Sequence, residues 1–558
     1  MVNTNNGSQA LIQSMINQQI HYVFGIPGAK VDHLFETLKY NDDVNTPKLI
    51  ITRNEQDAAF MAAGIGRITG KPGVVAVTSG PGVSNLVTGL MTATSEADPV
   101  IALGGQVQRD DLGRLTHQSI ASKELMTTAV KRSVEVQHAD NLSEAFMNAY
   151  QTAVAPKAGA TFMSLPADVL SDEATRPVLS PLSSPQIGVA SEKSISLLVQ
   201  KIKQAKLPVI LAGMRASTGA VADAIHQLIG KFPIPVVETF QGAGIISKTL
   251  EASYFGRVGL FRNQSGDALL KESDLILAVG YDPVEYEARN WHLNSQAEIV
   301  NLDEIQPEIS ADYQPQVVIQ ANISQSLLAL NAALPANLSL SPEVQQRLSQ
   351  FKQRFDAQRL VPTEAKEGLV HPLEIIKALQ QKVTTDTTVT VDVGSHYIWM
   401  ARYFRSYKPR HLLFSNGMQT LGVALPWAIA AALVRPDKPV VAVAGDGGFM
   451  YSSQELETAV RLKLPIVSIV FNDAHYDMVR FQEVAKYGKD AGVTLGPVNF
   501  AKLAESMGAK GLSVTDKDQL PAALDEAFAT NGPTVIDIPV DYRDNIKLKS
   551  DLLPDILD

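Results

Sequence analysis

The sequence lacks cysteine and has no excess of positive charge. With no cysteine among its 558 residues, disulfides, thiolate metal sites and a cysteine nucleophile are excluded. Asp and Glu number 58 against 48 Lys and Arg, which leaves a net charge of −10. Proteins that bind nucleic acid usually carry a basic face, so this balance argues against a nucleic-acid partner.

Long hydrophobic runs are also missing. The longest apolar stretch, residues 422–434, contains Pro426 and falls short of the ~20 residues that cross a bilayer, so we expect a buried helix there and no membrane span. The N-terminus, "MVNTNNGSQA", has neither the basic nor the apolar region of a secretory signal. We therefore expect a cytoplasmic protein.

What the sequence does have is a regular alternation of short β-branched runs with helical stretches. Examples are "GVVAVT" (73–78), "LPVILAG" (207–213), "TVTVDVG" (388–394) and "PVVAVAG" (439–445). Unbroken apolar strands separated by helices predict parallel sheets covered on both faces, that is, an α/β fold. Linker-like stretches rich in Pro and Ser or in charge, at 171–190 and 335–370, predict three domains at 1–175, 190–335 and 365–558.

A short repeat links the outer two domains. "GATFMSLPADV" (159–169) and "GPTVIDIPVDY" (532–542) share Gly-x-Thr, alternating apolar residues and Pro-x-Asp. Either the two segments end their strands in a similar way by chance, or the first and third domains have related folds and the middle domain a different one.

Acidic and amide side chains follow two successive strands of the third domain. Asp446, Gly447 and Gly448 come directly after one apolar strand, and Asn472 and Asp473 end the next, 24 residues further on. That spacing fits one helix plus one strand, so both ends should meet at the carboxyl edge of the sheet. "SSQE" (452–455) predicts the capped start of the intervening helix. Carboxylate, close backbone and helix N-terminus together suit a phosphate held through a divalent cation, although the residues alone also fit an ordinary turn.

Gly-Asp-Gly followed by Asn-Asp resembles the signature of the thiamine diphosphate-dependent enzymes. The resemblance implies thiamine diphosphate and Mg²⁺ as cofactors, with Asp446, Asp473 and the backbone carbonyl of His475 as metal ligands. It also implies that the two outer domains share one fold and that the middle domain is Rossmann-like. The residues it places around the cofactor are Thr78, Pro81, Gly82, Asn85, Gly394, Ser395, His396, Gln419, Leu421, Gly445, Gly447, Gly448, Tyr476, Asp477 and Met478.

The first domain carries the matching glutamate. Glu55 lies in "ITRNEQDAAFMAAG" (51–64), where a strand gives way to a helix, and taken alone it would only complement the helix dipole. The resemblance makes it the proton-relay carboxylate for the cofactor's pyrimidine, supplied by one subunit to the metal site of another. It implies a homodimer or homotetramer. By the same resemblance Gln118 faces the reacting centre; otherwise it is a helix-surface residue.

Within this class, segments 21–38, 109–120 and 540–545 are similar to those of acetolactate synthases. That similarity implies decarboxylation of pyruvate and its addition to a second pyruvate, giving 2-acetolactate and CO₂. The FAD-containing biosynthetic type carries Ala-Arg-Phe-Asp-Asp-Arg where this chain reads "AVGYDPVEYEARNWH" (278–292), and a tryptophan that 478–488 lacks. We therefore expect the catabolic type of the acetoin and butanediol route, without FAD or a regulatory subunit.

Some alternatives stay open at this point. Arg480 either binds a substrate carboxylate, for which its planar guanidinium is suited, or is a solvated surface charge. The rival activities are those of an FAD-containing biosynthetic acetohydroxyacid synthase, pyruvate oxidase or a simple 2-keto acid decarboxylase. A protein that binds the cofactor without catalysis would have no need of Glu55.

Overall fold

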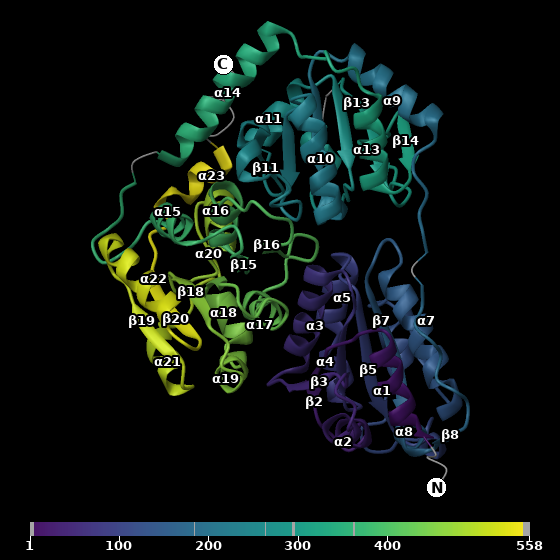
Figure 1. Cartoon of the computed structure of the whole chain (residues 1–558). Coiled ribbons are helices and arrows are strands. Elements are labelled where there is room, and N and C mark those ends of the chain that lie inside the picture. The colour runs from purple at the N-terminus through teal and green to yellow at the C-terminus, as the bar shows by residue number, and fades with distance from the viewer. Residues whose placement is uncertain (1–4, 184, 263, 293–295, 361–362, 551–558) are drawn as a thin grey trace.

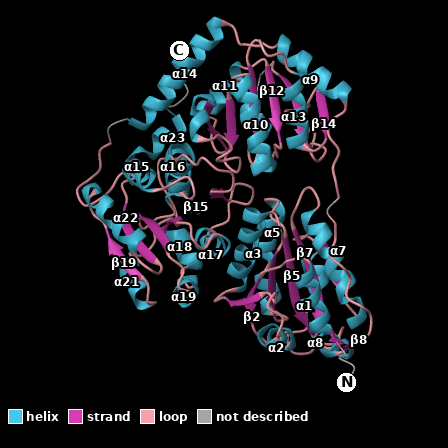
Figure 2. Ribbon diagram, in the orientation of Figure 1, coloured by secondary structure: helices cyan, strands magenta, loops and turns pink. Residues whose placement is uncertain are grey.

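The computed structural model describes residues 5–183, 185–262, 264–292, 296–360 and 363–550. The chain forms three α/β domains, each built on a six-stranded parallel sheet with helices on both faces (Figures 1 and 2). In the view of Figure 1 the N-terminal domain lies at the lower right, the middle domain at the top and the C-terminal domain at the left. The predicted fold class is confirmed.

The sheet of the N-terminal domain has the strand order β3-β2-β4-β5-β7-β6. Its central strands are buried along their whole length because helices cover both faces. The strands are β2 (Tyr22–Ile26), β3 (Lys48–Ile51), β4 (Gly73–Val77), β5 (Val100–Gln106), β6 (Arg132–Glu135) and β7 (Ala160–Pro166). The helices are α1 (Gly7–Asn17), α2 (Asp32–Tyr40), α3 (Glu55–Thr69), α4 (Pro81–Asn85), α5 (Val87–Ser95), α6 (Ser122–Met126), α7 (Leu142–Val154) and α8 (Ala167–Ser171). β1 (Asn5–Asn6) pairs with β8 (Glu173–Ala174) outside this sheet.

The C-terminal sheet, β16-β15-β17-β18-β20-β19, repeats that topology. In chain order both sheets read second, first, third, fourth, sixth, fifth, and the two repeat strings form equivalent strands, β7 and β20. The outer domains therefore share one fold. The strands are β15 (Thr388–Val391), β16 (Leu412–Phe414), β17 (Val440–Gly445), β18 (Ile466–Asn472), β19 (Lys510–Ser513) and β20 (Thr534–Pro539). The helices are α15 (Pro372–Lys382), α16 (Ser395–Tyr403), α17 (Ala424–Val434), α18 (Asp446–Ser452), α19 (Glu455–Arg461), α20 (Asp477–Tyr487), α21 (Phe500–Ser506), α22 (Leu520–Ala529) and α23 (Lys547–Ser550).

The middle domain differs, with the order β11-β10-β9-β12-β13-β14. In chain order this reads third, second, first, fourth, fifth, sixth, the order of dinucleotide-binding folds. Its strands are β9 (Pro208–Ala212), β10 (Val236–Thr239), β11 (Tyr254–Val258), β12 (Leu275–Val279), β13 (Glu298–Asp303) and β14 (Val317–Gln320). Its helices are α9 (Glu192–Gln204), α10 (Gly219–Lys231), α11 (Ser265–Glu272), α12 (Ala288–Trp291) and α13 (Ile323–Ala333).

Two helices hold the outer domains together. The apolar run at 422–434 forms α17, whose first nine residues are all buried, and α17 packs on α3 of the N-terminal domain. The contact is close: a Cβ on Gly64 would lie 2.8 Å from Cβ of Ala430. Between the middle and C-terminal domains, α14 (Pro342–Ala357) buries Phe351 and Phe355 in the middle domain's core. Within the described residues, no helix is long and apolar enough to cross a membrane.

Candidate active site

A pocket of about 190 Å³ lies beyond the carboxyl ends of β17 and β18. These strands are parallel neighbours, so Asp446, which follows β17, and Asp473, which follows β18, reach the same edge of the sheet, as their spacing predicts. The pocket brings together all the C-terminal residues predicted to bind cofactor or metal: Gly394, Ser395, His396, Gln419, Leu421, Gly445, Asp446, Gly447, Gly448, Asp473, His475, Tyr476, Asp477 and Met478.

The helix after Asp446 does not begin where the sequence indicates. "SSQE" predicts a capped start near residue 452, but α18 starts at Asp446 itself, and the N-cap of α19, Gln454, makes no side-chain cap. The chain can pass directly from strand to helix because Gly447 and Gly448 have no side chains. A Cβ would lie 2.7 Å from the Tyr476 ring at Gly447 and 2.6 Å from Asp392 at Gly448. The first helical turn, with its backbone N–H groups, therefore borders the pocket.

The acidic side chains of the pocket repel one another. Burial raises the pKa of Asp473 to about 8, and the nearby charges of Asp477 and Asp446 add to the effect. Burial likewise raises the pKa of Asp446 to about 6. A divalent cation between the carboxylates would offset both effects. His475 and Thr494 form an isolated antiparallel β-bridge. Its hydrogen bonds run from the Leu495 N–H to the Ala474 carbonyl and from the Tyr476 N–H to the Val493 carbonyl. The carbonyl of His475 takes no part in these two bonds.

Helix N-termini and a histidine suit the pocket to an anion. The first residues of α16, α18 and α20 all line it, so three helix N-termini border one space. His396 is 1% exposed, and its Nε2 has no hydrogen-bond partner among the described residues. Burial lowers its pKa to about 3, so the ring is neutral. A bound anion would give this orphaned nitrogen a partner.

The segment carrying Gln419 and Leu421 is fixed by a residue that the sequence analysis did not select. The Asp392 carboxylate accepts the backbone N–H groups of Gly422 at 3.0 Å and Ala424 at 3.1 Å. This holds Gln419 in a left-handed conformation with φ of 51°. The available signal was an aspartate at the end of the strand "TVTVDVG", the same pattern that pointed to Asp446.

Asp477 and two missed residues form a buried network beside the pocket. Ser395 Oγ donates to Asp477 Oδ2 at 2.6 Å, and Asn545 Nδ2 donates to the same oxygen. Asn545 is held in turn by Trp399, whose Nε1 donates to Asn545 Oδ1 at 2.7 Å. Tyr542, also missed, lines the pocket. Asn545 and Tyr542 both lie in residues 540–545, a segment that the sequence analysis used only for its similarity to acetolactate synthases.

Arg480 lies outside the lining of the pocket. Its side chain is 41% exposed and pairs with Asp490, with Nε 2.9 Å from Oδ2, and more distantly with Asp477 at 3.9 Å. Of the two readings that the sequence left open, this placement favours the surface charge in the single chain.

The predicted residues of the N-terminal domain gather at a second place. Glu55 is the first residue of α3, as expected, and its Oε2 accepts a hydrogen bond from Asn85 Nδ2 at 2.9 Å. Gly82, which follows Pro81 in α4, lies between the Glu55 carboxylate and Thr78.

Gln118, with φ of 61°, packs on Gly80 of the same turn. The described residues that line the Asp446 pocket all come from 393–542. Glu55 and Asp446 therefore lie at two separate places in the single chain.

Comparison with known proteins identifies the class. Residues 5–125, 195–330 and 392–538 match, in turn, the N-terminal TPP binding domain, the central domain and the C-terminal TPP binding domain of the thiamine pyrophosphate enzymes. The order of the three matches along the chain agrees with the three sheets of the structure. The protein is a thiamine pyrophosphate enzyme.

Its relatives narrow the class. The chain is 48% identical to the acetolactate synthase of Bacillus subtilis (strain 168) over 550 residues, 99% of this chain and 96% of the relative. It is 42% identical to the catabolic acetolactate synthase of Raoultella terrigena, over 98% and 97% of the two chains. The large subunit of acetolactate synthase isozyme 2 from Escherichia coli (strain K12) is 29% identical, over 97% of this chain and 96% of the relative. The chain belongs to the acetolactate synthase family.

Proposed function

We propose that the protein joins two molecules of pyruvate into 2-acetolactate, releasing CO₂, with thiamine diphosphate and Mg²⁺ as cofactors. The observation that carries this is the pocket where Asp446 and Asp473 meet the N-termini of α16, α18 and α20. The names of the relatives support the choice of reaction.

Different residues of the pocket would bind different parts of the cofactor. Asp446, Asp473 and the His475 carbonyl would bind Mg²⁺, which prefers oxygen ligands. The three helix N-termini, Gly447 and Gly448 with their close backbone, and His396 would hold the diphosphate. When bound, the cofactor supplies the electron sink for decarboxylation. Around it, the half-buried Leu421 and the fixed backbone of Gln419 orient the rings, and the apolar walls exclude water.

The site is completed by a second copy of the chain. Glu55, the carboxylate that would exchange a proton with the cofactor's pyrimidine, lies in a separate half-site. Beside the Asp446 pocket is an open hollow of about 590 Å³, walled by Met450, Tyr451, Leu495 and Phe500. Exposed apolar residues such as Met450 and Tyr451, which are 48% and 49% exposed, suit coverage by another subunit. A homodimer or homotetramer follows.

FAD is not part of the proposed enzyme. In a sheet with this strand order, a dinucleotide binds at the switch point, here between β9 and β12. Arg215 follows β9 at this edge: its Nη1 donates to Asp282 at 2.6 Å and its Nε to Asp303 at 3.0 Å, and both acids are buried. This buried ion-pair group, together with identity to a relative named catabolic, supports the catabolic, FAD-independent type without a regulatory subunit.

The test is to incubate the purified protein with pyruvate, thiamine diphosphate and Mg²⁺ in the absence of FAD and to identify the product. Acetolactate with release of CO₂ is the expected result, with no gain on adding FAD. Acetaldehyde would instead identify a decarboxylase. A flavin that copurifies and is required for turnover would restore the biosynthetic or oxidase alternatives.

A further inference from the structure

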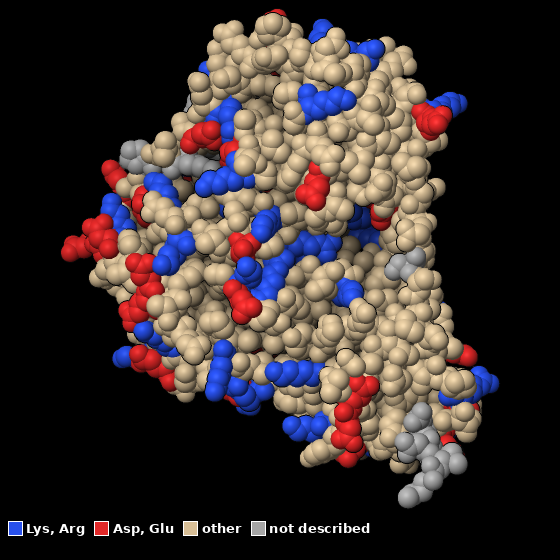
Figure 3. All heavy atoms as spheres, in the orientation of Figure 1, with Lys and Arg blue, Asp and Glu red and all other residues tan. Residues whose placement is uncertain are grey.

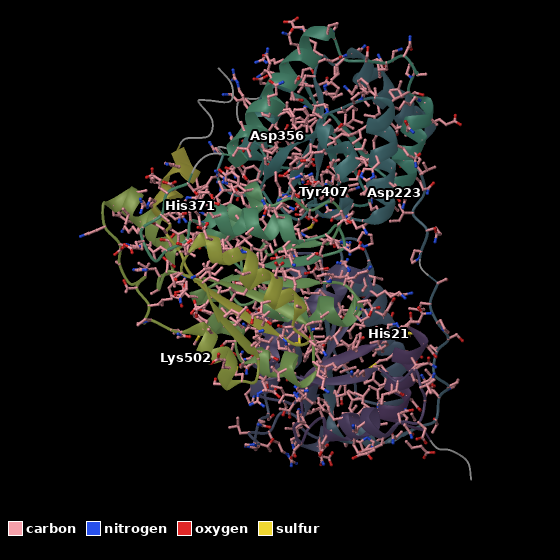
Figure 4. The ribbon with its side chains drawn as sticks, turned by 60° about the vertical axis from the view of Figure 1, so that its left-hand side comes forward. His21, Asp223, Asp356, His371, Tyr407 and Lys502 are labelled. Carbon is pink, nitrogen blue, oxygen red and sulfur yellow. The ribbon has the colours of Figure 1, made fainter. Side chains whose placement is uncertain are left out.

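A second cavity of about 190 Å³ lies where the three domains meet, and none of its lining residues lines the Asp446 pocket. Arg67 and Glu96 reach it from the N-terminal domain, Ser217 and Glu304 from the middle domain, and Arg410 from the C-terminal domain. Figure 3 shows Lys and Arg side chains gathered in the hollow at the centre of the molecule. In the side view of Figure 4, Asp223 marks α10 and Tyr407 marks the loop that leads to Arg410. The cavity is large enough for a small metabolite and not only for single waters.

Arg410 brings an unpaired positive charge to this cavity. Its Nε donates to the Ser217 carbonyl at 2.7 Å and its Nη1 to the Arg67 carbonyl, so two of its donors serve backbone oxygens of the other two domains. Within the described part of the chain it forms no ion pair with a carboxylate. Burial lowers its pKa, Asp98 offsets part of this, and the charge of Arg67 lowers it further. A desolvated cation without a counter-ion is costly.

Glu304 brings an unpaired negative charge. Its carboxylate accepts hydrogen bonds from Asn322 Nδ2, at 3.1 Å to Oε1, and from the backbone N–H of Ile323, but among the described residues no Lys, Arg or His forms an ion pair with it. Burial raises its pKa, and the neighbouring Asp303 adds to the effect. The charge of Arg215 offsets part of this rise in pKa, but the Arg215 guanidinium already donates to Asp282 and Asp303.

The other charged residues of the lining already have ion-pair partners. Arg67 is bonded to Asp98 and Glu96 and to the Phe414 carbonyl, so this group is satisfied internally. Ser217 is 3% exposed and its hydroxyl has no partner among the described residues. Buried polar groups are normally hydrogen-bonded, so an orphaned hydroxyl beside the cavity points to a missing partner. Apolar side chains, among them Leu412, also line the cavity, together with the polar Thr218 and Gln241.

We infer that the three-domain cavity binds a small zwitterion, an α-amino acid with a short apolar side chain. Its carboxylate pairs with Arg410, its ammonium group with Glu304, and Ser217 Oγ hydrogen-bonds to one of the two. A ligand with a single charge would leave either the cation or the anion of the cavity unpaired. A zwitterion satisfies both without changing the net charge of the junction.

Calorimetric titration of the full-length protein with three matched probes tests this inference. L-Alanine carries both charges, propionate lacks the ammonium group and ethylamine lacks the carboxylate. L-Alanine should bind at least about tenfold more tightly than either of the others, since each good ion pair contributes on that scale. Equal binding of propionate, or no saturable binding of L-alanine, would overturn the inference.

A pair of variants locates the site. Glu304→Gln keeps the size of the side chain and removes its charge, so L-alanine should bind at least about tenfold more weakly while any weak propionate binding stays unchanged. Glu308→Gln, at an exposed position nearby, is the matched control and should bind L-alanine like the natural protein. Glu304 is varied instead of Arg410 because Arg410 also bonds to backbone carbonyls of the other two domains, and its removal would disturb the contacts between domains. Unchanged binding in Glu304→Gln, or equal loss in Glu308→Gln, would contradict the assignment.

Discussion

At the residue scale, Glu55 is the group whose chemistry can be tested most directly. Glu55→Gln keeps an oxygen that can accept the Asn85 hydrogen bond but cannot exchange a proton. We expect kcat for acetolactate formation to fall by roughly 10²- to 10⁴-fold, the usual contribution of a positioned acid–base group. Affinity for thiamine diphosphate, followed by quenching of tryptophan fluorescence, should change little. Glu36→Gln, exposed on α2, is the control. Undiminished kcat would remove the proton-relay role.

Two residues from Glu55, a buried carboxyl pair predicts how stability depends on pH. Asp57 and Glu455 are both 0% exposed, and Gln454 Nε2 donates to Asp57 Oδ2 at 2.6 Å. Burial raises the pKa of Asp57 to about 9, and the charge of Glu455 adds to the effect. The folded state therefore holds a proton that the unfolded chain, with an Asp pKa near ~4, releases.

Since the folded-state pKa is the higher one, the contribution of Asp57 is fully present below about pH 4 and is lost as the pH rises toward 9. The loss is at most about 1.4 kcal/mol per pH unit. Asp57→Asn should flatten this dependence, measured as urea midpoints between about pH 6 and about pH 8. The exposed Asp43→Asn should leave the slope as it is. An unchanged slope in Asp57→Asn would mean that other groups set it.

At the scale of elements, Asn545 ties together the N-termini of α16 and α20. It donates to Ser395 Oγ at 2.9 Å and to Asp477, and it comes from the segment just before α23. His371, labelled in Figure 4, packs edge-on against Trp399 on the other side of this network. Asn545 thus positions two helices that border the Asp446 pocket without lining the pocket itself.

Asn545→Asp should therefore weaken thiamine diphosphate binding, by roughly tenfold or more, because two carboxylates would face each other where an amide now donates. Adding Asp477→Asn restores one amide and one carboxylate and should recover most of the affinity. Calorimetric Kd values for the single and double variants, with Tm as a check on folding, separate positioning from general stability. If the double variant bound thiamine diphosphate no more tightly than Asn545→Asp, the proposed pairing of Asn545 with Asp477 would be contradicted.

The same element shows where prediction from sequence ends. Asp446 and Asp473 could be found because ends of neighbouring parallel strands meet, whatever the details of packing. Asn545 lies 68 positions from its partner Asp477 in an irregular segment, and no periodicity links them. Gln118 and Gln419 were selected by resemblance, but their left-handed backbones are imposed by tertiary contacts that propensity does not contain.

At the scale of the whole molecule, the duplicated topology accounts for the two halves of the proposed site. The first and third sheets have equivalent strand orders, and each presents functional residues at the carboxyl edge of its strands: Glu55 after β3 and Asp446 after β17. A short string repeat suggested the duplication, and the resemblance to thiamine diphosphate-dependent enzymes implied it. It could not show that the halves of one chain stay apart, because that depends on how α3 and α17 pack.

Mixing two inactive variants tests the shared site. Asp446→Ala removes a metal ligand and Glu55→Gln the proton relay, so each homo-oligomer should be inactive. If each site combines Glu55 of one chain with Asp446 of its partner, a mixed dimer has one doubly altered site and one intact site. Statistical mixing makes half of the dimers mixed, so refolding the variants together should restore about a quarter of the natural activity. Variants assembled separately and then combined without exchange are the control. A mixture that stays inactive, although size measurements show mixed dimers, would place both halves of each site in a single chain.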